Sequence, residues 1–164
     1  MHTSIVVRAA VRADLPRVAK LAAELVRLHH NFDPQRFFCP DRVEQGYEWW
    51  FGQELGREQV VLLVAERGDR LVGYVYARIE ERDWNQLLDT HGAVHDLWVE
   101  QQDRRSGVAS ALAGAAIKAL TAKGAPRIVL HTAAANEAAQ RFFERLGFRR
   151  TMVEMTRESA SNPP

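Results

Sequence analysis

Hydrophobic and polar positions along this chain follow two periods, and each change of period marks a predicted element. Continuous apolar runs indicate buried strands, whereas apolar residues three or four positions apart indicate amphipathic helices. Strands are expected at 5–7, 60–65, 71–79, 94–99, 128–130 and 148–155, and helices at 15–28, 41–55, 108–123 and 137–146. The order, β-α-α-β-β-β-α-β-α-β, predicts one domain of the α+β (mixed α/β) class at 1–158, with helices packed on a sheet. Residues 159–164 are expected to form a frayed tail.

Composition and charge narrow the class of protein. The 164 residues are 46% hydrophobic and 26% charged, which is near the globular average and enough to bury a core. The formal net charge of +1 gives no general attraction to nucleic acid or membranes, and no apolar run approaches the roughly 20 residues that span a bilayer. The single cysteine, Cys39, excludes an internal disulfide. We therefore expect a cytoplasmic protein with no signal peptide and no nucleic-acid or membrane partner.

The stretch from Val94 to Ser110 carries the strongest chemical signal. A predicted strand is followed by a polar loop with Arg104 and Arg105, and Gly107 opens the next helix. The first amides of a helix have no partner within it, and they bind phosphate where a glycine lets the ligand approach and arginines neutralise its charge. The stretch lacks both the GxxxxGK[ST] of a nucleotide-hydrolase P-loop and the GxGxxG of a dinucleotide site. It therefore predicts a phosphate-binding loop of another kind.

Two segments indicate which kind. Residues 104–109 read Arg-Arg-Ser-Gly-Val-Ala, and residues 136–148 read Asn-Glu-Ala-Ala-Gln-Arg-Phe-Phe-Glu-Arg-Leu-Gly-Phe. Both resemble signature segments of the GNAT superfamily of N-acetyltransferases, and the order of elements is similar over nearly the whole chain. The resemblance implies a central, mostly antiparallel sheet that splays between its fourth and fifth strands, with helices on both faces. It also implies acetyl-CoA (CoA) as the cofactor and an amine as the acceptor.

The resemblance assigns cofactor-binding residues as well. It implies that backbone atoms of Leu97, Trp98 and Val99 hold the pantetheine arm and the thioester carbonyl. The pyrophosphate would be held by the loop and the first helical turn, at Arg104, Arg105, Ser106, Gly107, Val108, Ala109 and Ser110. The last helix would face the cofactor through Asn136, Ala139 and Phe143, although Asn136 also suits a plain helix cap.

Transfer to an amine needs a base, because a lysine-like amine with a pKa of about 10.4 is protonated at neutral pH. A histidine, with a pKa of about 6.5, suits that task. By resemblance, His95 occupies the position where polyamine-acetylating members carry a glutamate base, and Asp96 and Glu100 are the alternatives. On a regular strand His95 and Asp96 point to opposite faces, so only one of them is expected to line the thioester. A histidine bonded only to backbone is the structural alternative for His95.

Phe143 departs from the family pattern, because many relatives carry there a tyrosine that protonates the departing thiolate. A thiolate whose pKa is about 8.5 is a fair leaving group without such help. The change is compatible with a slower enzyme. It also leaves open a CoA-binding sensor or interaction module with weak or no catalysis.

The acceptor site, by the same resemblance, lies between the first two helices and the ends of the third and fourth strands. Its candidate residues combine carboxylates with aromatic rings: Asp33, Phe38, Trp50, Glu80 and Trp84. Such a set suits a small cationic amine, polyamine-like or aminoglycoside-like, whereas a merely solvated surface is the plain alternative. A peptide or protein amine also stays open as the acceptor. The six histidines lack the spacing of a metal site, and a homodimer could use a strand edge near 151–155.

Overall fold

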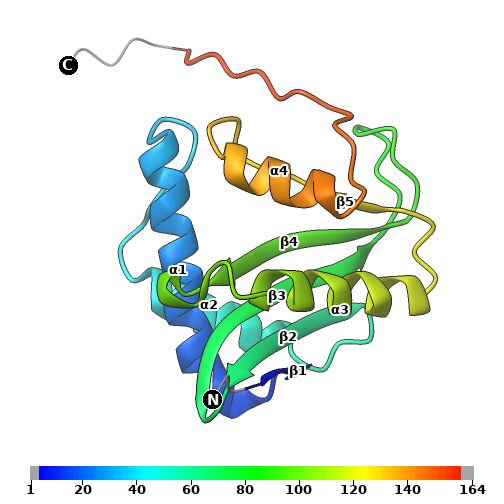
Figure 1. Cartoon of the computed structure of the whole chain (residues 1–164). Helices are drawn as coiled ribbons and strands as arrows, with labels where there is room; N and C mark the ends of the chain where they lie inside the picture. The colour runs from blue at the N-terminus through cyan, green and yellow to red at the C-terminus, as the bar shows by residue number, and fades with distance from the viewer. Residues whose placement is uncertain (1–3, 160–164) are drawn as a thin grey trace.

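A five-stranded sheet forms the centre of the molecule (Figure 1). The computed structural model describes residues 4–159. The strands, in the order in which they lie side by side, are β1 (Ile5–Ala9), β2 (Val60–Arg67), β3 (Arg70–Glu80), β4 (His91–Val99) and β5 (Ile128–Leu130). β1 to β4 pair antiparallel, and β5 lies parallel to β4. The prediction of a mostly antiparallel sheet is therefore confirmed.

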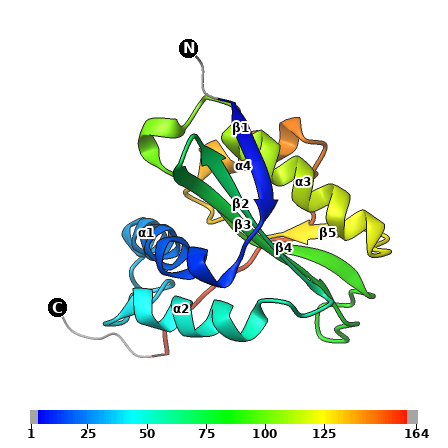
Figure 2. The ribbon, with the colours of Figure 1, turned by 90° about the horizontal axis from the view of Figure 1, so that it is seen from below.

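Helices cover both faces of the sheet, as predicted (Figure 2). They are α1 (Leu15–Phe32), α2 (Val43–Glu54), α3 (Val108–Ala122) and α4 (Glu137–Arg145), and short 3-10 turns lie at Arg12–Asp14 and Gln101–Asp103. Neighbouring residues of β3 serve two cores, because Tyr74 is buried against α1 and α2 while Val75 is buried against α3. In the described part of the chain, no helix has the length and apolarity needed to cross a membrane.

The pairing of β4 with β5 is short. Residues 92–94 lie opposite residues 128–130, and β4 then continues to Val99 while the chain after Leu130 leads to α4. Among the described residues, no further strand pairs with β4 on this side. The predicted splay between the fourth and fifth strands is therefore confirmed. It leaves the backbone from His95 to Val99 along the open side of the sheet.

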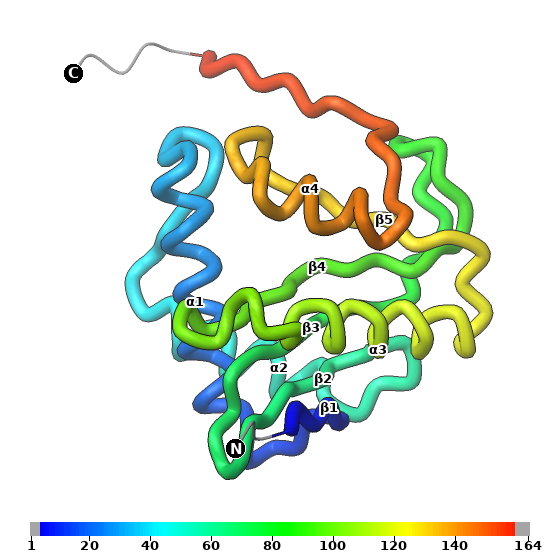
Figure 3. Tube along the Cα trace, in the orientation of Figure 1, coloured from blue at the N-terminus to red at the C-terminus, as the bar shows by residue number. Residues whose placement is uncertain are grey.

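The prediction of a strand at 148–155 is wrong. These residues form no strand, and the segment runs outside the sheet, past α4 and toward the end of α1 (Figure 3). Its exposed apolar side chains are Met152, Val153 and Met155, at 74–89%. A run of strand-forming residues needs a partner edge, and β5 is only three residues long. Most of the tail expected at 159–164 lies outside the described residues.

Candidate functional site

A bulge in β4 decides which side chains reach the site. Tyr76 of β3 pairs with Asp96, but the next residue, Ala77, pairs with Val94, so that His95 has no residue opposite it. One extra residue in a strand interrupts the alternation of its side chains. As a result, His95 and Asp96 line the same pocket. The two side chains therefore do not lie on opposite faces, as a regular strand would place them, and which of them lines the thioester stays a prediction.

The pocket at this bulge has a volume of about 250 Å³. Its lining comes from α2, β3 and β4 and comprises Tyr47, Trp50, Tyr76, Arg78, Glu80, His95 and Asp96. The three lining residues of β3 are alternate ones, which share a face of the strand. Two of the predicted catalytic residues, His95 and Asp96, thus lie beside two of the predicted substrate residues, Trp50 and Glu80.

His95 contacts a carboxylate and an aromatic ring. Its Nε2 lies 2.8 Å from Oε1 of Glu80. Its ring stacks on that of Tyr76, with 5.5 Å between the centroids and 28° between the planes. Because its polar partner is a side chain, His95 is not a histidine bonded only to backbone. With Nε2–H donating to Glu80, Nδ1 is the nitrogen left to accept a proton.

A buried carboxylate on α2 supports this arrangement. Glu54 is fully buried, and its Oε2 accepts hydrogen bonds from Oη of Tyr76 at 2.7 Å and from Arg78 at 2.9 Å. Nε of Arg78 lies 3.3 Å from Oε1 of Glu80. Burial, together with the bond to Glu54, raises the pKa of Tyr76 to about 12, so that its hydroxyl remains a donor. Glu54 therefore contacts Tyr76, on which His95 stacks. It also contacts Arg78, which lies beside Glu80, the carboxylate partner of His95.

Sequence reasoning missed this support. The alternation along β3 could have found Tyr76 and Arg78, since they share a face with Glu80. Nothing in the local pattern of α2 relates Glu54 to them, because the contact forms only when α2 packs on the sheet.

Asp96 lies deeper in the same pocket. Oη of Tyr74 donates a hydrogen bond to its Oδ2 at 3.0 Å. Burial raises the pKa of Asp96, and burial likewise raises the pKa of Tyr74 and of Tyr47. Carboxyl groups with raised pKa values are common at sites of proton transfer. His95 is the more exposed of the two acceptors.

The loop between β4 and α3 presents amides and arginines to solvent. Gly107, the N-cap of α3, has a φ of +88°, a left-handed conformation that favours glycine. Arg104 and Arg105 are exposed. Nε of Arg104 donates to the carbonyl of Val99 at 3.1 Å, and its guanidinium lies 4.6 Å from the ring centroid of Trp98. Unpaired amides beside two guanidinium groups fit the diphosphate of CoA.

The remaining predicted cofactor residues near this loop differ in burial. Ser106 and Ser110 are exposed, and Ala109, Leu97 and Trp98 are half-buried. Val108 and Val99 have buried side chains in the core beneath α3. For these two residues, backbone atoms are what could meet a ligand.

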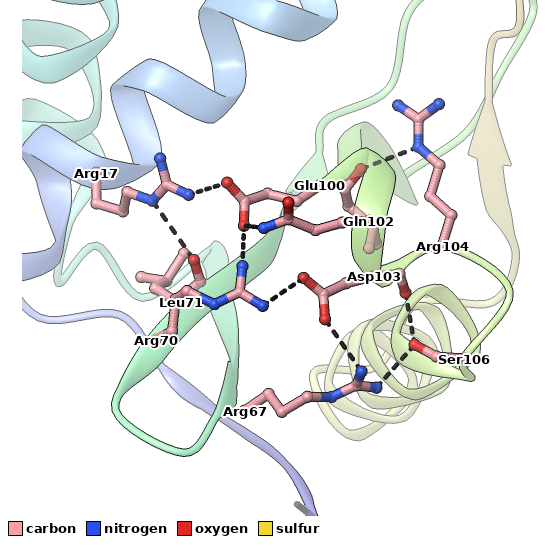
Figure 4. Close-up of polar contacts among 10 residues, drawn as sticks. Arg17, Arg67, Arg70, Leu71, Glu100, Gln102, Asp103, Arg104 and Ser106 are labelled. Carbon is pink, nitrogen blue, oxygen red and sulfur yellow. Dashed lines mark hydrogen bonds and ion pairs between the residues drawn. The ribbon is translucent and has the colours of Figure 1, made fainter.

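Glu100 lies outside the pocket, just after β4. Its carboxylate is paired with Arg17 of α1 and with Arg70 of β3 (Figure 4). These two guanidinium groups engage the oxygens that a base would use. We therefore assign Glu100 to the support of the loop rather than to proton transfer.

The predicted cofactor residues at α4 are its N-cap, Asn136, and two residues of the helix itself, Ala139 and Phe143. Oδ1 of Asn136 accepts a hydrogen bond from the amide of Ala139 at 3.2 Å, so the side chain caps the helix. Phe143 is half-buried and packs edge-on against Phe142 and Phe148, with centroids 5.0 and 5.6 Å away. It belongs to an apolar cluster rather than to the pocket lining.

Three predicted substrate residues lie outside the pocket. Oδ1 of Asp33 accepts the amides of Gln35 and Arg36, which makes it a turn residue. Phe38 is 80% exposed and Trp84 is 75% exposed. The loops that carry these residues therefore present them to solvent and not to the space beside His95.

Known proteins match this chain in sequence. A model of the acetyltransferase (GNAT) family matches residues 23–148. Over 126 residues the chain is 32% identical to mycothiol acetyltransferase of Thermobispora bispora, which covers 70% of this chain and 40% of that protein. Over 85 residues it is 36% identical to N-alpha-acetyltransferase 30 of Schizosaccharomyces pombe, which covers 52% of this chain and 55% of that protein. The chain thus spans about two fifths to about half of these curated relatives.

Solved structures share the fold. The tetramutant of the BH1408 protein from Bacillus halodurans has a TM-score of 0.81 at 20% identity, covering 93% of this chain and 99% of that one. Aminoglycoside N-acetyltransferase AAC(6')-Iy, in its complex with CoA, has a TM-score of 0.76 at 19% identity, covering 96% of each chain. At these identities the likeness concerns the fold alone.

Proposed function

Because the chain belongs to the acetyltransferase (GNAT) family, whose cosubstrate is acetyl-CoA, we propose that it transfers an acetyl group to a primary amine held beside His95. The observation that carries this proposal is the coincidence of two features at one point. The part of β4 that has no partner on the β5 side begins at His95, where the pocket containing the His95–Glu80 pair opens. A ligand bound along that strand therefore has its reactive end next to a base.

The residues around the splay fit CoA in a defined direction. The first amides of α3, with Arg104 and Arg105, bind the diphosphate. The backbone of Leu97, Trp98 and Val99 binds the pantetheine arm in the manner of an added strand. The thioester carbonyl then lies toward His95, at the other end of the unpaired stretch.

His95 acts as the general base. Glu80 accepts the Nε2–H bond and fixes the tautomer, so that Nδ1 takes the proton of the incoming amine, directly or through one water molecule. The amine nitrogen forms a bond to the carbonyl carbon, the carbon–sulfur bond breaks, and the thiolate takes a proton from solvent. Asp96, whose pKa is raised by burial, is the second candidate for the base.

The lining of the pocket favours a small cationic amine as acceptor. Arg78 is neutralised by Glu54 and Glu80, while Trp50 and Tyr47 add aromatic faces that attract cations. The aminoglycoside N-acetyltransferase that shares the fold acts on amines of this class by its name. A peptide amine is the alternative, since N-alpha-acetyltransferase 30 is a relative in sequence.

A CoA-binding module with little or no catalysis is the second candidate function. Phe143 favours it, because a phenylalanine cannot protonate the departing thiolate. The His95–Glu80 pair argues against it, since a binding module has no use for a histidine held by a carboxylate in the pocket.

Release of free thiol from acetyl-CoA, measured across polyamines, aminoglycosides and peptides with free amino termini, separates the two functions. The proposal predicts release that depends on the amine, strongest for small cationic amines. A rise in melting temperature with CoA, without release on any amine, would favour the binding module.

The homodimer and the cytoplasmic location stay predictions. Residues 151–155 form no strand, so the strand edge on which we expected the dimer to form is absent.

A further inference from the structure

Asp103 is a buried carboxylate outside the pocket, in the loop that leads from β4 to α3. Its exposed fraction is 2%, and a carboxylate buried so deeply needs charged or hydrogen-bonding partners. Arg67 and Arg70 are those partners, with nitrogens 3.0 Å from Oδ1 and 2.8 Å from Oδ2. The two arginines lie opposite each other at the end of the β2–β3 hairpin. Asp103 therefore joins both strands of this hairpin to the loop, beside the pairing of Arg70 with Glu100 (Figure 4).

The same contacts extend to the residue before the N-cap of α3. Arg67 also donates to Oγ of Ser106 at 2.8 Å, and Ser106 donates to the backbone carbonyl of Asp103. Residues 103–106 thus form a turn that is held by the hydrogen bond from Ser106 to Asp103, and the guanidinium of Arg67 contacts both of these residues. Gly107 and the first amides of α3 follow directly along the chain, so the direction of these amides depends on the turn at 103–106.

The arginines around the loop divide into two groups. Arg17, Arg67 and Arg70 are engaged with the carboxylates of Glu100 and Asp103. Arg104 points away from this cluster (Figure 4), and both it and Arg105 are exposed. The first group holds the loop, whereas the second pairs with no carboxylate of the described residues and keeps its charge for an anion.

We propose that Asp103 is a positioning residue for the diphosphate of CoA. By holding Arg67 and Arg70, it fixes the loop and the first amides of α3 in the conformation that binds the anion. This inference rests on the proposed function, because it takes CoA as the ligand of the loop.

The sign of the effect separates this role from simple electrostatics. By Coulomb's law, removing a negative charge near an anion site strengthens anion binding. Removing an anchor weakens it instead, because the loop must then be ordered at an entropic cost when the ligand binds. The two effects therefore predict opposite changes in the affinity for CoA when Asp103 is replaced by a neutral side chain.

Isothermal titration calorimetry with CoA on the full chain measures the outcome. Asp103→Asn is expected to weaken CoA binding about 10-fold or more, the scale of a lost charge-assisted hydrogen bond. Arg67→Lys keeps the positive charge but replaces the two nitrogens that reach Asp103 and Ser106 by a single ammonium group, and it is expected to weaken binding as well. The control is Asp69→Asn, which removes the same charge from the hairpin turn between the two arginines. It leaves the affinity unchanged or slightly higher.

A folded Asp103→Asn variant that binds CoA as tightly as the wild type, or more tightly, overturns the inference. Where Asp103→Asn does not fold, Arg67→Lys decides, and undiminished affinity in that variant overturns the inference equally. Failure of the wild-type chain to bind CoA is a different result: it contradicts the proposed function itself, and the role of Asp103 falls with it.

Discussion

Nε2 of His95 lies 2.8 Å from Oε1 of Glu80, although 15 positions separate the two residues along the chain. The contact joins β3 to β4 at the bulge, where His95 has no residue opposite it. It gives the histidine a fixed partner on one nitrogen and leaves the other nitrogen available. Two neighbouring strands thus form the His95–Glu80 pair that we propose as the base.

Replacing His95 by alanine is expected to lower kcat/KM by about 10²- to 10⁴-fold, the usual contribution of a general base. The acidic limb of the pH–rate profile should disappear with it, because that limb reports protonation of the base. The measurement is kcat/KM against pH for both proteins with the best amine of the panel. An unchanged acidic limb in His95→Ala would exclude this histidine and favour Asp96.

Replacing Glu80 by glutamine tests the partner. The neutral amide no longer stabilises the imidazolium that forms as His95 takes a proton, so a loss of about 10-fold in kcat/KM is expected, with folding intact. Glu81→Gln is the matched control, because it removes the same charge from the next residue, which is exposed. Equal rates for the two variants would show that Glu80 contributes only bulk charge.

Asp96 predicts an unusual dependence of stability on pH. Burial raises its pKa in the folded state above the value of about 3.9 expected for the unfolded chain. From about pH 4 upward the folded state therefore holds more protons at this residue, and its contribution to stability falls as pH rises to the folded pKa and remains reduced above it. Asp96→Asn removes this loss, so the variant should gain on the wild type between pH 4 and pH 7 in urea unfolding.

Asp14 is the control of opposite sign for that experiment. Its hydrogen bonds with Arg8 hold its pKa below the ordinary value. That stabilisation is present above the unfolded pKa and is lost as pH falls through the folded pKa. Asp14→Asn should therefore be less stable than the wild type at pH 7 and should approach it in acid. If the stability of both variants relative to the wild type changed with pH in the same direction, the raised pKa of Asp96 would be contradicted.

A side chain at Gly73 would clash with β4, the strand that we propose binds the cofactor. A Cβ at this position would lie 2.7 Å from the carbonyl oxygen of Trp98 on β4, so backbone has to move. We expect Gly73→Ala to destabilise the fold by about 1–3 kcal/mol. Gly114→Ala, at a position on α3 where the added carbon has no heavy atom within 4 Å apart from the adjacent residues and backbone of the helix itself, should stabilise it by about 0.5–1 kcal/mol. Denaturant unfolding of both variants measures the difference, and equal stabilities would contradict the predicted clash.

The sequence allowed much of the sheet to be predicted, because β2, β3 and β4 are continuous apolar runs and the loop before α3 has a chemical signature of its own. The side chains at the site were harder to predict. A bulge is not visible in the pattern of one strand, so the position of Asp96 beside His95 could not be foreseen. Glu54 and Asp103 depend on contacts between distant elements. The apolar residues after Phe148 have the pattern of a strand, but β5, at the edge of the sheet, is only three residues long.

A crystal structure of the chain with bound CoA would show whether the ligand follows the open side of β4 from α3 to His95. We expect the diphosphate on the first amides of α3, the pantetheine arm along Leu97 to Val99, and the sulfur at the mouth of the pocket that contains His95. Well-defined CoA elsewhere on the surface, or in the splay with its sulfur directed away from His95, would contradict it.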